Sequence, residues 1–226
     1  ANQNARVVIV PYAVGSTGLY SASQWMPITG TLTTDAIAKT NAALTAAAMQ
    51  FGTATMKGIL WHQGESDLFG RPIQEYRSNL LQIVDSLRTI NGASNVPFIA
   101  GGLAHPTYVA GALWADPDSG PRWRSFLSTL GTKFPYAGYA DSESPTNLGL
   151  EVHFSAAEQR TMAGRFWTAW QAALVNTSPA VTWDPYDTEL DQTYLMVFSN
   201  GNKDVSGNYI DGWKSVRATV GHITGK

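Results

Sequence analysis

Apolar residues recur along the chain with two alternating periods, and this alternation predicts an α/β protein. Short apolar or β-branched runs that are typical of buried strands occupy residues 5–14, 57–63 and 95–104. Apolar positions three and four residues apart, as on one face of a helix, occupy residues 33–51, 71–92 and 155–174. Strands that alternate with helices favour a parallel sheet with helices on both faces. We therefore expect a doubly wound, three-layer α/β domain of the flavodoxin-like kind.

Capping signals set the expected helix ends. Thr34 and Asp35 are cap-type residues at the start of the first helix, and Gly52 follows its last turn. Ser155 and Glu158 have the spacing of a capping box before the last helix. The apolar face expected for the second helix is Ile73, Tyr76, Leu80, Val84 and Leu87, and that for the last helix is Met162, Phe166, Trp170 and Leu174.

The character of the sequence changes after this last helix. Residues 1–175 form the expected α/β domain, 176–190 a linker rich in Pro, Asp and Thr, and 191–226 a short β-rich segment with turn signals between short strands. The last segment is too short for a domain of its own and looks like the beginning of a larger β-rich module.

Charge and composition exclude several classes of function. The formal net charge is −2 without a Lys or Arg run, which gives no electrostatic footprint for nucleic acid or for an anionic membrane surface. The chain has no Cys, so disulfides, thiolate catalysis and zinc-thiolate sites are excluded. No run of about 18 apolar residues is present, so we expect no membrane insertion.

Two polar loops are expected to meet at the carboxyl edge of the sheet. Gly15 and Ser16 follow the first expected strand, and the segment WHQGESD (61–67) follows the second. Ligands bind at this edge in parallel α/β sheets. The alternative for WHQGESD is structural: Trp61 packs in the core while the polar residues cap the next element.

The segment WHQGESD resembles the third signature block of SGNH hydrolases, in the branch of sialate O-acetylesterases and acetylxylan esterases. AVGSTGL (13–19) resembles the glycine-bearing second block of that branch, and EVHFSAAEQRTMAGRFW (151–167) resembles its terminal His block and final helix. The three blocks follow one another in the expected order over residues 5–174. The resemblance implies an SGNH fold and a carbohydrate O-acetylesterase that needs no metal or organic cofactor.

The resemblance also implies roles for individual residues. Gly15 and Gln63 would supply the N–H donors of an oxyanion hole, and His153 would be the base. Glu151 is the expected acid, although related blocks carry Asp two or three positions before the His; Asp141 and a Ser-His dyad without an acid are the alternatives.

The expected nucleophile is missing from the chain. The family carries its serine in a Gly-x-Ser block after the first strand, upstream of everything matched here, and neither Ser16 nor Ser66 holds that place. We therefore expect a fragment, whose serine comes from a preceding segment or a cleaved partner chain. We also expect that residues 1–226 do not fold alone, because a sheet without its first strand exposes backbone edges and an apolar face.

Other residues suggest weaker hypotheses. His105, Tyr108 and Trp114 lie in a long polar and aromatic loop that could face a sugar ring, or simply pack as a loop. His62 and Glu65 imitate half of an H-x-x-E-H metal motif, but Ser66 replaces its second His and the segment is expected to be a loop. The C-terminal stretch 202–226 resembles the opening strands of SPRY-like β-sandwich domains.

The leading interpretation is an esterase that removes acetyl groups from a polysaccharide or a sialic-acid-like sugar. Its alternative is a carbohydrate-binding or structural module on an esterase scaffold without turnover. An esterase core, a linker and a further β-rich segment without Cys would suit a bacteriophage tail spike, which places the protein outside the cell or on a virion surface. Such an assembly could be a homo-oligomer.

Overall fold

The computed structural model describes residues 6–68, 73–107, 119–144, 147–149 and 152–177. The chain divides into two compact units, residues 1–182 and 183–226, and all described residues belong to the first. The expected linker beyond Thr177, the β-rich segment 191–226 and its SPRY-like stretch lie outside the described residues.

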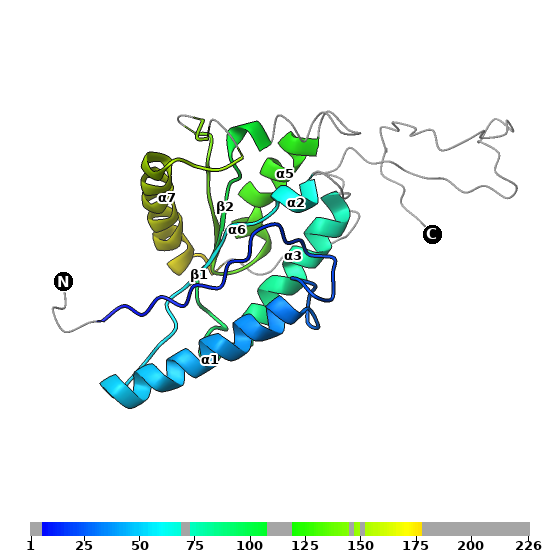
Figure 1. Ribbon diagram of the computed structural model, residues 1–226. Coiled ribbons are helices and arrows are strands. Elements are labelled where there is room, and N and C mark those ends of the chain that lie inside the picture. Colours follow the sequence, from blue (N-terminus) through cyan, green and yellow to red (C-terminus); the bar gives the residue numbers. More distant parts are fainter. Residues whose placement is uncertain (1–5, 69–72, 108–118, 145–146, 150–151, 178–226) are drawn as a thin grey trace, which may run out of the picture. The chain divides into compact units, whose positions relative to one another are not determined.

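The described sheet has three parallel strands in the order β1-β2-β3 (Figure 1). They are β1 Ile59–Trp61, β2 Phe98–Gly101 and β3 Ala137–Ala140. Every residue of β2 is buried, as expected for a central strand covered on both faces. The parallel sheet and its strands at 57–63 and 95–104 are confirmed. Across the described sheet the strands follow one another in chain order, with no reversal of that order. The second half of a doubly wound sheet therefore stays a prediction.

The strand expected at residues 5–14 is wrong for the described part of that segment. Residues 6–14 belong to no helix or strand, and Val7 and Ile9 are 88% and 80% exposed. A β-branched run becomes a strand only where a neighbour offers backbone hydrogen bonds. The sequence favours a strand here, but no described strand pairs with this segment.

Helix α3, Ile73–Leu87, confirms the clearest periodic pattern of the sequence. All five residues of its expected apolar face are buried. Tyr76 lies against Trp123 with 3.9 Å between ring centroids, which joins α3 to α5, Ser119–Ser128. Neither α5 nor the short α6, Leu130–Lys133, was among the helices expected from the sequence.

Helix α7, Ala156–Leu174, packs against β2 and β3, with α5 on the other side of the sheet in Figure 1. Its N-cap is Ser155, whose capping box with Glu158 is confirmed by both hydrogen bonds. Met162 is buried and Phe166 packs against the same cluster, but Leu174 is 44% exposed, so its expected inward position is wrong. Leu174 is the last helical residue, and its neighbour Ala173 occupies the buried position in the core cluster instead.

Helix α1, Thr31–Phe51, begins earlier than expected. Its N-cap is Gly30 rather than Thr34 or Asp35, because the backbone of residues 22–26 already accepts hydrogen bonds from Thr31, Leu32 and Gly30. Gly52 ends the helix with φ 88°, a conformation that favours glycine, so this expected stop is confirmed. No helix in the described ranges is long and apolar enough to span a bilayer.

Candidate functional site

Two loops meet at the carboxyl edge of the sheet, as the sequence predicts. The side-chain amide nitrogen of Gln63 lies 3.1 Å from the carbonyl oxygen of Thr17. The backbone N–H of Leu19 donates to Oδ1 of Asp67 over 3.2 Å. Asp67 is 2% exposed, so a buried carboxylate links the loop after residue 14 to the loop after β1.

Asp67 lies on a short helix, α2, Glu65–Leu68, where the sequence was interpreted as a loop. The turn forms because Asp67 and Leu68 donate their backbone N–H groups to the carbonyl of Gly64. Gly64 adopts φ 147°, a conformation in which a side chain would be strained, and a Cβ atom there would lie 3.1 Å from the ring of Trp123. The turn fixes Asp67 beneath the loop 15–19 and leaves Glu65 at its start.

The glycine that permits close approach is Gly18 rather than Gly15. A Cβ atom on Gly18 would lie 2.4 Å from Oδ1 of Asp67, whereas one on Gly15 would meet nothing within 4 Å. Gly15 lies exposed in a turn with Ser16, which has φ 59°. The close approach of Asp67 therefore requires glycine at position 18 and not at position 15. The role of the Gly15 backbone N–H as an oxyanion donor stays a prediction.

Gln63 uses both protons of its amide within the protein. Its Nε2 donates to Thr17 O and also to Oδ2 of Asp67. The hydroxyl of Tyr76 donates to the Gln63 carbonyl over 2.9 Å, which fixes the backbone as well. The amide is thus held at the junction of the two loops, and it would serve an oxyanion by releasing its bond to Thr17.

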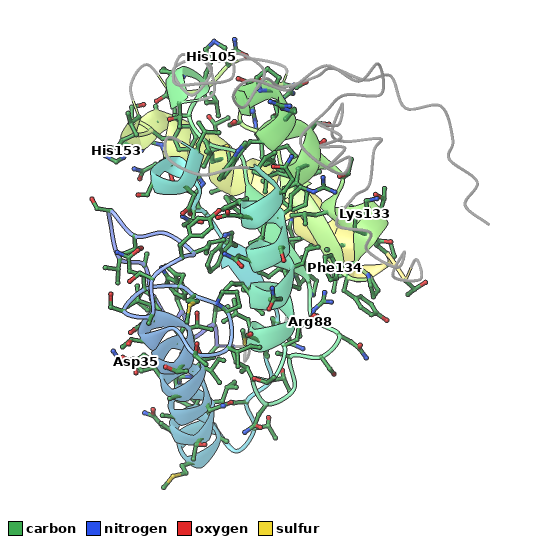
Figure 2. The ribbon with its side chains drawn as sticks, turned by 90° about the vertical axis from the view of Figure 1, so that its right-hand side faces the viewer. Asp35, Arg88, His105, Lys133, Phe134 and His153 are labelled. Carbon is green, nitrogen blue, oxygen red and sulfur yellow. The ribbon has the colours of Figure 1, made fainter. Side chains whose placement is uncertain are left out.

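His153 lies beside the same loop. It immediately precedes Phe154, whose ring centroid is 5.6 Å from that of His62. His62 in turn lies with its Nε2 3.2 Å from Oε1 of Glu65. His153 is exposed next to the N-cap of α7, and Figure 2 shows it at the same end of the domain as His105. The His block and the WHQGESD block are therefore brought together.

The pKa of Glu65 is influenced by two histidines, His62 and His153. Burial alone would raise the pKa of Glu65, but the hydrogen bond and charge of His62, its own backbone N–H and the charge of His153 together bring the pKa below its ordinary value. Glu65 is therefore ionised at neutral pH. Glu151, the expected acid, lies outside the described residues.

A hollow of about 230 Å³ opens between the two loops. Its lining consists of Ser16, Gly18, Tyr20, Ser21, Gln24, Ser66 and Asp67. Both serines considered as nucleophiles lie at this hollow, on the side of Asp67. No described contact joins either of them to His153.

A second polar cluster follows β2 and β3 at the same edge. Nδ1 of His105 lies 2.5 Å from Oε1 of Glu143, and Nη2 of Arg124 lies 2.7 Å from Oδ2 of Asp141. Asp141 is thus held by a guanidinium, and no described contact joins it to His153. Tyr108 and Trp114, expected beside His105, lie outside the described residues.

His62 and Glu65 do contact each other, but they do not extend into a metal centre in the described part of the chain. No group of three or more His, Cys, Asp or Glu there could hold a metal ion. The contact is an i, i+3 pair across the start of α2.

Comparison with protein families identifies the chain. The sequence model of a family described as carbohydrate esterase, sialic acid-specific acetylesterase, matches residues 1–172. The chain belongs to this family. No curated protein sequence matches the chain. Membership of this family makes the protein a carbohydrate esterase, which is a carboxylic ester hydrolase.

The matched range contains every site residue of this esterase that the sequence singled out. It also contains residues that the sequence did not: Gly18, Glu143 and Arg124, and Glu65 in a role other than metal binding. Glu65 could have been found from its place in the WHQGESD block. Arg124 and Glu143 carry no such signal, because they lie outside the sequence motifs and meet only through the packing of α5 on β3.

Proposed function

We propose that the chain forms most of the active site of a carbohydrate O-acetylesterase with a serine-histidine mechanism. The observation that carries the proposal is the convergence of three distant segments, the loop 15–19, the loop 62–67 and His153, at the carboxyl edge of one parallel sheet. Ester cleavage needs a base, a carboxylate and N–H donors close together, and these segments supply them.

The reaction uses His153 as a proton carrier. His153 takes the proton of a serine hydroxyl while the serine oxygen bonds to the acetyl carbon. The carbonyl oxygen of the acetyl group gains the negative charge. The sugar oxygen then leaves with the proton from His153, and the acetyl group stays on the serine. A water molecule repeats the sequence and releases acetate and the free serine. Gln63 and the N–H of Gly15 are the proposed donors to the oxyanion.

Glu65 is a proposed partner of the imidazolium that forms on His153. Its carboxylate is ionised, lies at the start of α2 beside His62, and feels the charge of His153. A carboxylate in this position stabilises the protonated base. Glu151, two residues before His153, is the alternative carboxylate that the family resemblance implies.

The serine is proposed to arrive on a strand that pairs with the free edge of β1. In the described sheet β1 is an edge strand, and its Leu60 is 63% exposed. Val7, Val8 and Ile9, which precede the loop 15–19, are further exposed apolar residues. An added strand would satisfy the open backbone groups of β1 and would end at the same edge as Gln63 and His153. That strand would come from outside residues 1–226.

The proposal is tested on the natural polypeptide that contains the chain, with an aryl acetate as substrate. We expect hydrolysis that persists in EDTA, because the oxyanion is met by amide donors. His153→Ala should abolish turnover and leave the melting temperature unchanged, since His153 is exposed. Loss of activity in EDTA with recovery in zinc, or a His153→Ala variant with most of its rate, would contradict the mechanism.

The two carboxylates are separated by a matched pair of variants. Glu65→Gln should lower kcat about a hundredfold or more and Glu151→Gln much less, if Glu65 supports His153. The reverse order would assign the role to Glu151. A natural polypeptide that folds and binds acetylated sugar but cleaves no ester would favour the non-catalytic binding module.

A further inference from the structure

Four side chains form a connected charged cluster on the loops that follow β2 and β3. The Glu143 carboxylate contacts His105 Nδ1 over 2.5 Å and Arg124 Nε over 3.1 Å. The Asp141 carboxylate contacts Arg124 Nη2 over 2.7 Å and accepts the backbone N–H of Glu143 over 3.0 Å. The cluster is reachable from solvent, because the side chains of His105 and Arg124 are 37% and 38% exposed.

The position of this cluster suits the sugar part of an ester held at His153. It follows the carboxyl ends of β2 and β3, while Gln63 and Glu65 follow that of β1. Adjacent strands are spaced by about 5 Å, so the cluster begins within about 10 Å of the WHQGESD loop, the scale of one or two sugar rings. Figure 2 shows His105 and His153 toward the same end of the domain, and Asp35 at the other.

The cluster carries no excess of positive charge, because one guanidinium is paired with two carboxylates. Arg124 directs Nε and Nη2 at the two carboxylates, and Arg165 from α7 donates to the carbonyl oxygen of Asp141. The hydrogen bond to Asp141 raises the pKa of Arg124, so this guanidinium stays ionised at neutral pH. The guanidinium of Arg124 faces both carboxylates, and the imidazole of His105 adds hydrogen-bonding capacity.

The guanidinium of Arg124 is already paired with the carboxylates of Asp141 and Glu143. A ligand carboxylate needs a cation that is not already neutralised. Sugar hydroxyls instead need donors and acceptors in fixed directions, which a carboxylate-bound imidazole and an anchored carboxylate provide.

We propose that His105, Glu143, Arg124 and Asp141 form the sugar-recognition subsite of the esterase, and that this subsite selects an uncharged O-acetylated sugar over one that carries a carboxylate. The inference rests on the proposed function and narrows its substrate class. It predicts a preference for neutral substrates, although the family is described as sialic acid-specific.

The test compares three esters on the natural polypeptide: an aryl acetate, an O-acetylated neutral xylo-oligosaccharide and 9-O-acetyl-N-acetylneuraminic acid. We expect kcat/KM for the neutral sugar ester to exceed that for the anionic one by about tenfold. An equal or higher value for the anionic ester overturns the inference. No hydrolysis of any of the three overturns the proposed function instead.

Variants assign the selectivity to the cluster. Glu143→Gln and Asp141→Asn each remove one negative charge and keep the side-chain shape, so the anionic-to-neutral ratio of kcat/KM should rise about fivefold in each variant. Asp35→Asn, a charge removal at the far end of the domain, is the control and should leave the ratio unchanged. An unchanged ratio in both cluster variants, or an equal fall for all three esters, would show that the cluster is only structural.

Discussion

Asp67 is the residue that joins the two loops of the site. Its buried carboxylate accepts the N–H of Leu19 and a proton of the Gln63 amide. Burying a carboxylate costs free energy unless hydrogen-bond donors surround it. Because the donors to Asp67 come from both loops, its burial holds the loops together. Gly18 leaves the space that this carboxylate fills.

Gly18→Ala should therefore destabilise the protein, and Gly15→Ala should not. The new Cβ at position 18 would lie 2.4 Å from Oδ1 of Asp67, and we expect an overpacking cost of about 1–3 kcal/mol. The matched change at position 15 meets nothing and should stay within about 0.5 kcal/mol. Urea unfolding of both variants measures the difference. Equal stability losses would mean that the loops do not meet as described.

Gln63→Ala should lower kcat by roughly a hundredfold with little change in KM, the usual scale for one lost oxyanion donor. The exposed Gln74 on α3 provides the control, and Gln74→Ala should be silent. Steady-state kinetics on an aryl acetate separates the alternatives. A change confined to KM would assign Gln63 to substrate binding. A large loss of stability without a kinetic change would show that Gln63 only holds the loops together through Thr17 and Asp67.

The elements of the fold were predictable where local pattern decides them. Helix α3 has its apolar face at regular steps, and α7 has a complete capping box, so both could be found from sequence. Strand β3 could not, because AGYA is four residues with a glycine and becomes a strand only beside β2. The strand predicted at residues 6–14 is wrong for the opposite reason: the local pattern favours a strand, but no described strand lies beside it to pair with.

The same distinction separates the parts of the site. Gln63 and His153 could be proposed from contiguous motifs, whereas the Arg124–Asp141–Glu143 cluster depends on how α5 packs against β3. Residues far apart in sequence meet there through tertiary packing, which no local period reveals.

The link between α5 and β3 should make stability depend on pH. Burial alone would raise the pKa of Asp141, but the hydrogen bond and charge of Arg124 and the backbone of Glu143 bring it below its ordinary value. A lowered carboxyl pKa contributes stability that is present above the ordinary value of about 3.9 and is lost as pH falls through the folded value. Asp141→Asn should thus be less stable than the native chain at pH 7 and nearly equal to it at pH 2.

Chemical denaturation at the two pH values measures this effect, with Asp35→Asn as the exposed control. A stability difference that is the same at both values would contradict the contribution of the ion pair.

The whole molecule is proposed to be completed by a strand from outside residues 1–226. The free edge of β1, the exposed Leu60 and the exposed Val7 and Ile9 all favour an added neighbour. The proposal explains why the base, the donors and a carboxylate converge while no described contact joins a serine to His153. The extracellular or virion-surface location, the SPRY-like segment, the tail-spike architecture and a homo-oligomeric state stay predictions.

Labelling of the nucleophile tests this central claim most directly. A fluorophosphonate probe is added to the 226-residue chain and to the natural polypeptide that contains it, and the labelled peptides are identified by mass spectrometry. The account predicts that the 226-residue chain hydrolyses no aryl acetate and carries no label, and that the natural polypeptide is labelled on a serine outside these residues, with the label lost in His153→Ala. A cooperatively folding 226-residue chain with full activity and its label on Ser16 or Ser66 would contradict it.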